Sequence, residues 1–195
     1  MASNIYQLTN YQLKQLSIKP IINYQLSNYQ LTQLPMRICL FPGTFDPVTL
    51  GHTDIINRAM PLFDKIVIGI GRNVNKVPMY SEEQRLNWLK EIYKNEPRVE
   101  VVAYDGLTVN CCKKVGATFI LRGIRYVNDF EYEKAIADMN RSITGNIETV
   151  FFTCLPQYTS VASTLVRDVI KNGGDVSQFL PTVVNESITN FLKSK

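Results

Sequence analysis

The chain has 195 residues, 45% of them hydrophobic, and a formal net charge of +4. That length fits one globular domain with a substantial core. A small net charge without a basic block or tail does not indicate generic nucleic-acid binding. No apolar run approaches the roughly 18 residues of a membrane-spanning helix, and the N-terminus lacks the order of a signal peptide. We therefore expect a cytoplasmic protein that does not enter the membrane.

The four cysteines do not form a recognisable functional cluster. None of Cys39, Cys111, Cys112 and Cys154 belongs to a CxxC pair, and no histidine accompanies them. Neither a zinc site nor a redox pair is indicated. We expect reduced thiols, as in cytosolic proteins.

Residues 1–35 differ in composition from the rest of the chain and contain no Asp or Glu. A Tyr-Gln-Leu tripeptide recurs there at uneven intervals, beginning at Tyr6, Tyr11, Tyr24 and Tyr29. The repeats are too few and irregular for a solenoid, so we interpret the stretch as a low-complexity N-terminal extension. It is either a disordered tail or an artefact of a true start at Met36. Residues 36–195 are predicted to form the functional domain.

Short runs rich in Val, Ile and Phe alternate from Met36 onward with longer amphipathic stretches. Strands are predicted at Arg37–Phe41, Ile66–Ile70, Val99–Tyr104, Thr118–Leu121 and Thr149–Phe152. Helices are predicted to begin near Gly51, Ser81, Leu107 and Phe130, then to span Ser163–Asn172 and to run from Pro181 to the C-terminus. This order predicts an α/β fold, a doubly wound, Rossmann-like parallel sheet of five strands with helices on both faces. Ligands bind such sheets beyond the carboxyl ends of the strands.

Two of these helices carry terminal signals. Ser81-Glu82-Glu83-Gln84 has the pattern of a capping box, in which the Ser81 and Gln84 side chains each satisfy a backbone group. Gly173-Gly174 predicts the end of the helix that starts at Ser163.

The first predicted strand runs into a loop suited to phosphate. Gly43 and Gly51 let the backbone approach a ligand closely, and Thr44 offers a hydroxyl. A helix that opens near Gly51 presents unpaired N–H groups and a positive dipole end to an anion. His52, the only histidine of the chain, would face that anion. A lone histidine is more often structural, but this placement favours a role in a site.

The string GTFDPVTLGH, which ends at His52, resembles the signature of the HxGH nucleotidyltransferases. These enzymes transfer a nucleotidyl group to a phosphate or phosphorylated acceptor. The first motif position is Thr49 rather than His, and this TxGH form is characteristic of the phosphopantetheine adenylyltransferases. The resemblance implies that Thr44, Phe45 and His52 bind ATP, that Thr44 also binds the acceptor, and that His52 hydrogen-bonds the α-phosphate in the transition state.

Two arginines follow the fourth predicted strand, at Arg122 and Arg125. Guanidinium groups at a strand end suit phosphate oxygens because their forks donate two hydrogen bonds at once. On the residues alone, an ordinary network of surface ion pairs with Asp129, Glu131 or Glu133 is equally open.

The pattern RGxRxxxDFEYE that begins at Arg122 resembles a second signature of the phosphopantetheine adenylyltransferases. Arg122 then matches a contact to the pantetheine substrate. Gly123, Ile124, Arg125 and Glu133 match contacts to ATP, while Asp129 and Glu131 are left as structural.

Lys76 lies in the loop before the Ser81 helix, where a lysine is usually only solvated. The family pattern places a lysine before a Pro-Met-aromatic sequence, and Val77-Pro78-Met79-Tyr80 resembles it. The resemblance implies that Lys76 contacts the acceptor phosphate. Thr108 falls where the family binds this substrate largely through its backbone.

The last cluster precedes the helix that starts at Ser163. Hydroxyls and free N–H groups at a helix start make an anion site, although a plain N-cap is commoner there. The run resembles the family's ATP-binding (I/V)SSS segment, with Ala162 in place of one hydroxyl. The implied ATP contacts are Tyr158, Thr159, Ser160, Val161, Ala162, Ser163 and Thr164. Tyr158 would stack near the adenine, or else only pack.

Two general nucleotide motifs are absent. Gly69-Ile70-Gly71 begins like GxGxxG, but its sixth position is Val74, and the chain has no GxxxxGK[ST] sequence. A dehydrogenase and a P-loop NTPase are therefore disfavoured.

The resemblance covers residues 36–194 and implies a complete reaction. The adenylyl group of ATP would pass to 4′-phosphopantetheine by direct in-line attack, giving dephospho-coenzyme A and pyrophosphate. Thr44, His52, Lys76 and Arg125 are the implied catalytic residues. The implied cofactor is Mg²⁺, which arrives with ATP, so no protein metal ligands are expected, and the implied assembly is a homohexamer.

Three alternatives stay open at this point. The chain could be another HxGH enzyme, such as a nicotinate-mononucleotide adenylyltransferase or a cytidylyltransferase, although the second signature argues against it. It could be a nucleotide-binding regulator without catalysis, although none of the main charged motif residues is missing. An RNA-binding role would rest on the lysines and aromatics of residues 1–35 alone.

Overall fold

The structure is a computed structural model that describes residues 35–72 and 77–193. We describe the unit that begins at Met36. The interpretations of the N-terminal extension and of Lys76 concern residues outside these ranges, and they stay predictions.

The core of the fold is one parallel sheet of five strands in the order β3-β2-β1-β4-β5. All four strand pairings are parallel. The strands are β1 (Ile38–Gly43), β2 (Lys65–Gly71), β3 (Val99–Tyr104), β4 (Phe119–Ile124) and β5 (Glu148–Thr153). Because the order reverses between β1 and β4, connections leave these two neighbours toward opposite edges, and a crevice opens at their carboxyl ends.

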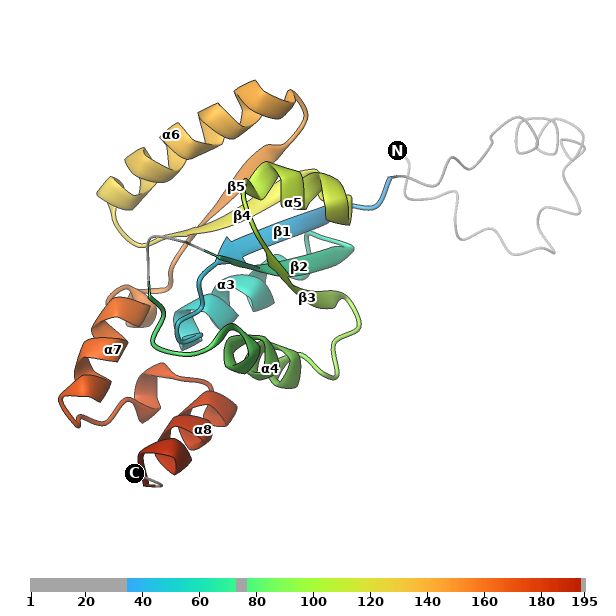
Figure 1. The fold of residues 1–195 in the computed structure, drawn as a ribbon. Helices are drawn as coiled ribbons and strands as arrows, with labels where there is room; N and C mark the ends of the chain where they lie inside the picture. The colour runs from blue at the N-terminus through green and yellow to red at the C-terminus, as the bar shows by residue number, and fades with distance from the viewer. Residues whose placement is uncertain (1–34, 73–76, 194–195) are drawn as a thin grey trace, which may run out of the picture. The chain divides into compact units, whose positions relative to one another are not determined.

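Helices connect the strands and cover both faces of the sheet (Figure 1). They are α3 (Leu50–Ala59), α4 (Glu82–Ile92), α5 (Thr108–Val115), α6 (Val127–Thr144), α7 (Ser163–Lys171) and α8 (Thr182–Lys193). Short 3-10 turns, η2 (Pro156–Tyr158) and η3 (Ser177–Phe179), precede the last two helices. The fold class and each predicted strand are confirmed; β3 has the predicted ends, and the ends of the other strands differ by one to three residues.

The sheet separates two hydrophobic cores. The larger core joins Ile55 of α3, Trp88 of α4 and Ile188 of α8 to one face of the sheet. The smaller core packs Val109 and Cys112 of α5 on the other face. A sheet buried on both faces explains why its strands read as nearly continuous apolar runs. Among the described residues, no helix has both the length and the apolar character needed to cross a bilayer.

The prediction for the start of α6 was wrong by three residues, since α6 begins at Val127 rather than near Phe130. The reason is electrostatic: Asp129 lies in the first turn, where a carboxylate faces unpaired N–H groups, and it accepts a hydrogen bond from the Arg125 N–H. One of the two bonds of the capping box predicted at the start of α4 is confirmed, because Ser81 Oγ accepts from the Gln84 N–H at 3.1 Å. No bond from the Gln84 side chain is found there in the described structure.

Candidate active site

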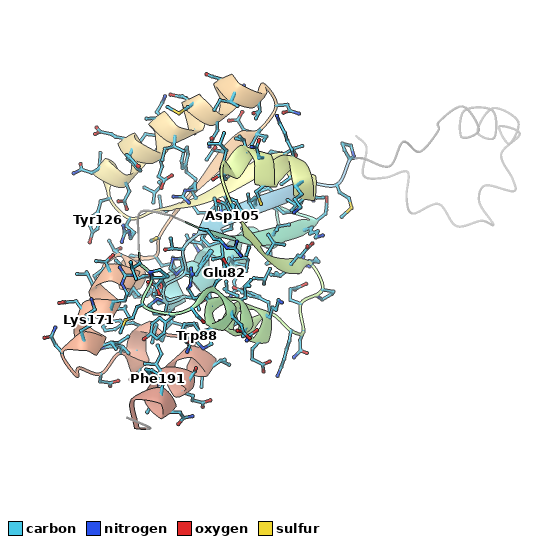
Figure 2. The ribbon with its side chains drawn as sticks, in the orientation of Figure 1. Glu82, Trp88, Asp105, Tyr126, Lys171 and Phe191 are labelled. Atoms are coloured by element: carbon cyan, nitrogen blue, oxygen red, sulfur yellow. The ribbon has the colours of Figure 1, made fainter. Side chains whose placement is uncertain are left out.

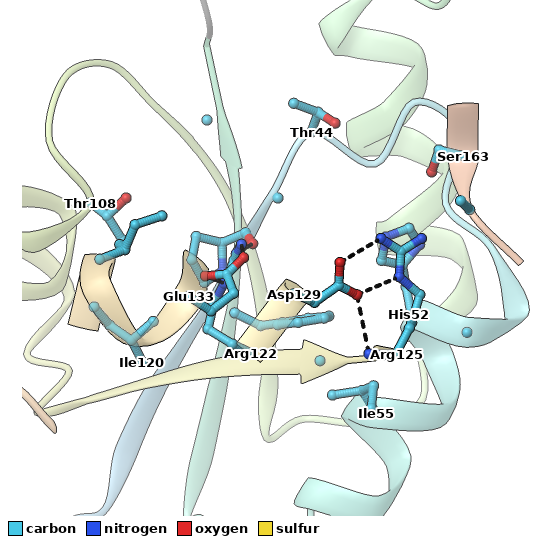
Figure 3. Close-up of a pocket in the computed structure, with 18 of the residues that line it drawn as sticks. Thr44, His52, Ile55, Thr108, Ile120, Arg122, Arg125, Asp129, Glu133 and Ser163 are labelled. Carbon is cyan, nitrogen blue, oxygen red and sulfur yellow. Dashed lines mark hydrogen bonds and ion pairs between the residues drawn. The ribbon is translucent and has the colours of Figure 1, made fainter. Parts of the chain in front are cut away.

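A pocket of about 850 Å³ opens at the carboxyl ends of β1 and β4 (Figure 3). Regions far apart in the sequence line it, among them the β1–α3 loop, the ends of β2 and β3, the start of α5, the end of β4 with α6, and the start of α7. In the view of Figure 3, Thr108 and Ser163 lie at opposite ends of the pocket. Twelve of the predicted site residues line it: Thr44, His52, Thr108, Arg122, Gly123, Arg125, Glu133, Tyr158, Val161, Ala162, Ser163 and Thr164.

The β1–α3 loop turns one side chain outward and the next inward. Thr44 is exposed in the pocket, whereas Phe45 has a positive φ of 49° and its ring is buried. A non-glycine residue in this conformation is uncommon and often marks a functional loop. A Cβ on Gly43 would lie 2.9 Å from Phe45 Cζ. We expected the close approach to Gly43 to come from a ligand, but it comes from the Phe45 ring, which packs against the loop from inside the protein.

Two buried polar side chains, Asp46 and Arg85, hold the β1–α3 loop in place through hydrogen bonds. Asp46 is 5% exposed, and its carboxylate accepts from the N–H groups of Met79 and Tyr80, each at 2.9 Å. Arg85 of α4, also 5% exposed, donates to the carbonyl oxygen of Thr44 at 2.6 Å. These bonds join the β1–α3 loop to the start of α4, so the position of Thr44 depends on both elements.

His52 lies in the first turn of α3, with its ring turned back on the start of its own helix. The Thr49 N–H donates to Nδ1 at 3.0 Å, and Thr49 Oγ1 lies 2.9 Å from the same atom. A backbone N–H can only donate, so Nδ1 is the acceptor and the neutral ring carries its proton on Nε2. His52 is therefore an N–H donor on the wall of the pocket.

The surroundings of His52 keep this ring neutral. Burial, and then the positive charges of Arg125 and Arg122, lower the pKa of His52 to about 4. Since both effects disfavour the imidazolium, the ring is uncharged at neutral pH. A neutral Nε2–H can donate to a phosphate oxygen without itself transferring a proton.

Arg122, at the end of β4, joins that strand to β1 and α6. Its guanidinium donates to the carbonyl oxygen of Pro42 at 2.7 Å and forms a bidentate pair with Glu133. The side chains of this pair are 28% and 12% exposed. Glu133 is thus the partner of Arg122 in the described structure, and its predicted contact with ATP is untested.

Arg125 forms the second pair of the pocket. Its Nε donates to Asp129 at 3.0 Å, and Asp129 also accepts from the Arg125 N–H (Figure 3). Burial acts to raise the pKa of Asp129, but its hydrogen bonds with Arg125 and that charge outweigh burial and lower it. Both arginines are therefore paired and also line the pocket, so pairing with a carboxylate does not remove either of them from it.

The start of α7 supplies backbone donors to the pocket. Its N-cap is Ala162, and no side chain caps this end. The first N–H groups of a helix lack partners within it and carry the positive end of its dipole. Replacement of a hydroxyl by Ala162 therefore leaves the N–H groups at Ser163 and Thr164 available to an anion.

Some predicted site residues do not line this pocket. The side chains of Phe45 and Ile124 are buried, so neither is available as a side-chain ligand. Thr159 and Ser160 belong to the turn after η2, where backbone bonds within the turn hold them. Within the predicted ATP-binding run, Tyr158 before them and the residues from Val161 to Thr164 after them do line the pocket.

Sequence reasoning missed several lining residues. Arg72 follows β2 directly, Tyr104 ends β3, and Asn140 lies two turns after Glu133 on α6. The sequence contained signals for them, because Arg72 and Tyr104 lie at the carboxyl ends of predicted strands, where ligands bind such sheets. Asn140 shares a helix face with Glu133 because seven residues make nearly two turns.

The pocket offers no ready-made metal site. No cluster of three or more His, Cys, Asp or Glu side chains suited to a metal ion occurs in residues 35–72 and 77–193. Asp129 and Glu133, the carboxylates of the pocket, are held by arginines. The four cysteines are free thiols, as predicted.

Comparisons with known proteins give the family. The sequence profile of the cytidylyltransferase-like family matches residues 40–169. A phosphopantetheine adenylyltransferase from Flavobacterium psychrophilum is 53% identical over 76% of this chain and 98% of its own length. Relatives of that name from Lachnoclostridium phytofermentans (44% identical; 78% of this chain and 94% of their own length) and Caldanaerobacter subterraneus (42%; 81% and 99%) also match.

A solved structure supports the fold. It is described as a candidate nicotinate-nucleotide adenylyltransferase from Vibrio parahaemolyticus, with a TM-score of 0.56, 20% identity, and coverage of 78% of this chain and 97% of that one. A sequence identity of 20% shows similarity of fold and does not indicate a shared activity. The curated relatives match at much higher identity, and over nearly their full lengths. With its TxGH loop and paired arginines in one pocket, the chain belongs to the phosphopantetheine adenylyltransferases, a family of nucleotidyltransferase enzymes.

Proposed function

We propose that this enzyme transfers the adenylyl group of ATP to 4′-phosphopantetheine, giving dephospho-coenzyme A and pyrophosphate. The observation that carries the proposal is the Nε2–H of neutral His52, fixed by Thr49 and placed in one pocket with Arg122 and Arg125. Such a group of donors suits a phosphorus centre on which negative charge grows.

In the proposed step, a phosphate oxygen of the acceptor attacks the α-phosphorus of ATP in line. One new P–O bond forms, the bond from the α-phosphorus to the bridging oxygen breaks, and both electrons leave with pyrophosphate. The enzyme forms no covalent intermediate. Positioning and charge stabilisation supply most of the acceleration in reactions of this kind. Mg²⁺ enters with ATP and neutralises its phosphates.

Each end of the pocket takes one substrate in this proposal. ATP binds where α7 begins, since the N–H groups at Ser163 and Thr164 and the nearby Arg125 are suited to its phosphates. The acceptor binds toward Arg122 and Thr108. Thr44 lies between the reacting groups. Lys76, outside the described residues, holds the acceptor phosphate, as the family resemblance implies.

We also propose that the enzyme works in the cytoplasm as a homohexamer. Helix α6 supports an assembly, because none of its side chains is buried within the described chain. Its exposed apolar side chains are Val127, Phe130, Tyr132, Met139 and Ile143. Light scattering on purified protein tests this: a monomer at micromolar concentration would contradict it.

A direct assay tests the reaction. Purified enzyme is mixed with ATP, Mg²⁺ and either 4′-phosphopantetheine or nicotinate mononucleotide, and pyrophosphate release is measured. We expect release with 4′-phosphopantetheine only. Release with nicotinate mononucleotide alone would assign a different acceptor, and release with neither acceptor would mean that the site does not catalyse this transfer.

A further inference from the structure

The connection between β5 and α7, residues 154–162, forms one wall of the pocket at the end where we place ATP. Cys154, Tyr158, Val161 and Ala162 all line the pocket. Within residues 154–162 only the short turn η2 is regular. The course of this connection therefore depends on its contacts with neighbouring elements, and helix α3 makes contacts near both of its ends.

The first contact comes from Arg58, in the last turn of α3. Its guanidinium Nη2 donates to the carbonyl oxygen of Thr153 at 2.7 Å, and the group lies 5.4 Å from the centre of the Phe152 ring. Because β5 is an edge strand, some of its carbonyl groups have no neighbouring strand to bond. The next N–H, that of Cys154, donates to the Ile124 carbonyl of β4 at 2.8 Å. The end of β5 is thus held by both α3 and β4.

Asp54, one turn earlier on α3, holds this arginine in place. Its Oδ2 accepts from Nε of Arg58 at 3.1 Å and from Nη2 at 2.9 Å. The side chain of Asp54 is 10% exposed and that of Arg58 is 33% exposed. Pairing with a buried carboxylate restricts the guanidinium to an orientation in which it also reaches Thr153. Neither charged residue lines a pocket of the described structure, so their influence on a substrate is indirect.

The start of α3 contacts the far part of the same connection. A Cβ on Gly51 would lie 3.6 Å from the carbonyl oxygen of Val161 and 3.7 Å from Tyr158 Cβ, which are ordinary packing distances. His52 follows Gly51 directly. Helix α3 therefore carries the neutral histidine donor between the two points at which it contacts the β5–α7 connection.

We infer that Arg58 is a positioning residue for ATP, acting through Thr153. It fixes the start of the β5–α7 connection, so the wall that includes Tyr158 and Val161 keeps its place relative to His52. A nucleotide bound on this wall then presents its α-phosphate to the His52 donor. This inference rests on the proposed function, and it predicts an effect on ATP and not on the acceptor.

Steady-state kinetics of the forward reaction separates the two substrates. We expect Arg58→Met to raise the KM for ATP about fivefold to tenfold, up to the value of one hydrogen bond from a charged group. The KM for 4′-phosphopantetheine should change little. Arg58→Lys keeps the charge but not the planar fork, so it should recover only part of the loss. An equal rise in both KM values would overturn the inference.

A second variant separates the contact with Thr153 from the charge of Asp54. Arg58→Met leaves this buried carboxylate without its partner, which is destabilising by itself. Combining Arg58→Met with Asp54→Asn removes the charge, and the double variant should keep the raised KM for ATP. Asp54→Asn alone leaves the bond to Thr153 and should keep most of the affinity. A wild-type KM for ATP in the double variant would overturn the inference, because the unpaired charge would then be the cause.

Arg98 offers a matched control. Like Arg58, it donates to a carboxylate, that of Glu96, and to a backbone carbonyl, that of Met60 at 3.3 Å. It lies outside both pockets, directly before β3 and therefore at the amino ends of the strands. Arg98→Met should lower the melting temperature and leave both KM values unchanged. A rise in the KM for ATP as large as that of Arg58→Met would mean that ATP affinity follows stability in general, and the inference would be wrong.

Calorimetry with ATP and Mg²⁺, without an acceptor, makes the test independent of the proposed acceptor. Wild-type enzyme should bind ATP about five to ten times more tightly than the double variant, whose melting curve is compared to confirm folding. If this holds while 4′-phosphopantetheine fails in the forward assay, the acceptor is wrong and the role of Arg58 stands. If the folded double variant binds ATP as the wild type does, the inference is wrong even when the forward reaction succeeds.

Discussion

At the scale of the residue, the site depends on which atoms donate hydrogen bonds. His52 illustrates this: its Nδ1 accepts from Thr49, its Nε2 carries the proton, and two arginines oppose its ionisation. A histidine so held does not serve as an acid or base near neutral pH. In the proposed reaction it would act as a fixed dipole that interacts more strongly with a charged transition state than with the ground state.

Removal of this ring should slow turnover far more than it weakens ATP binding. For His52→Ala we expect kcat to fall about 100-fold to 1000-fold, the usual loss of one preorganised donor, with the Kd for ATP changed only slightly. Stopped assays and calorimetry measure the two quantities separately. Equal losses in both would mean that His52 serves ground-state binding.

The lowered pKa of His52 also predicts the pH dependence of turnover. Because the folded-state pKa is about 4 instead of the usual 6.5, kcat should show no decline near pH 6.5 that is due to this ring. A profile of kcat from pH 5 to 8 measures it. A loss of activity that titrates near pH 6.5 and disappears in His52→Gln would contradict a neutral, buried donor.

Stability should respond to the same shift. Between pH 6.5 and 4 the unfolded chain binds a proton at His52 that the folded chain refuses, so the free energy of unfolding falls as the pH falls through this window. From pH 7 to 5 the loss should be about 1–2 kcal/mol. Urea titrations of wild type and His52→Gln measure it. His52 is the only histidine, so a slope of equal size in the variant would exclude this cause.

At the scale of the element, the sequence predicts what depends on periodicity. The strands are short runs of apolar residues covered on both faces, which pattern alone can identify. The ends of elements that are set by individual side chains are harder to predict. Helix α6 starts three residues before the predicted position, where Asp129 accepts from the Arg125 N–H. In the sequence, these two charged residues look like part of a surface loop. Likewise, Phe45 is predicted to bind ATP because it belongs to the motif, and only the structure shows that its ring is buried.

Other contacts cannot be read from a single sequence because they join distant segments. Glu82 and Asp105, both labelled in Figure 2, accept hydrogen bonds from Arg72 at 2.5 and 2.9 Å. Asp105 is 33 residues away from Arg72. Pairs of this kind depend on which strand ends the topology brings together, and that in turn follows from the order of β3, β2 and β1.

The start of α4 allows a local test. Ser81→Ala removes the oxygen that accepts from the Gln84 N–H, and we expect a loss of about 1 kcal/mol in the free energy of unfolding. Ser142→Ala, within α6, is the matched control, since its hydroxyl bonds only to the carbonyl of Asp138 in its own helix. Urea titrations of both variants measure the difference. A similar loss in both would mean that capping is not the cause.

At the scale of the whole molecule, the described site is contained in the unit that begins at Met36. Every residue that lines the first pocket lies between Phe41 and Thr164. The unit also has its own sheet and both hydrophobic cores, so it should fold without the preceding residues.

A chain restricted to residues 36–195 should keep the melting temperature, kcat and both KM values of the full chain. Calorimetric melts and the pyrophosphate assay measure these quantities. A loss of acceptor affinity would instead give the extension a part in the site. Filter binding of labelled RNA at low salt, on the full and shortened chains, examines the RNA-binding alternative, which predicts weaker binding after shortening.

The hydrogen-bond polarity of the pocket has a consequence for inhibitor design. Close to His52 the wall presents Nε2–H and the guanidinium groups of Arg122 and Arg125, which are donors, and the pocket carboxylates of Asp129 and Glu133 already accept from those two arginines. A drug fragment placed there should carry acceptors without protons of their own, such as a sulfonyl group. An amine at the same point would set donor against donor and lose affinity, however well its shape fitted the cavity.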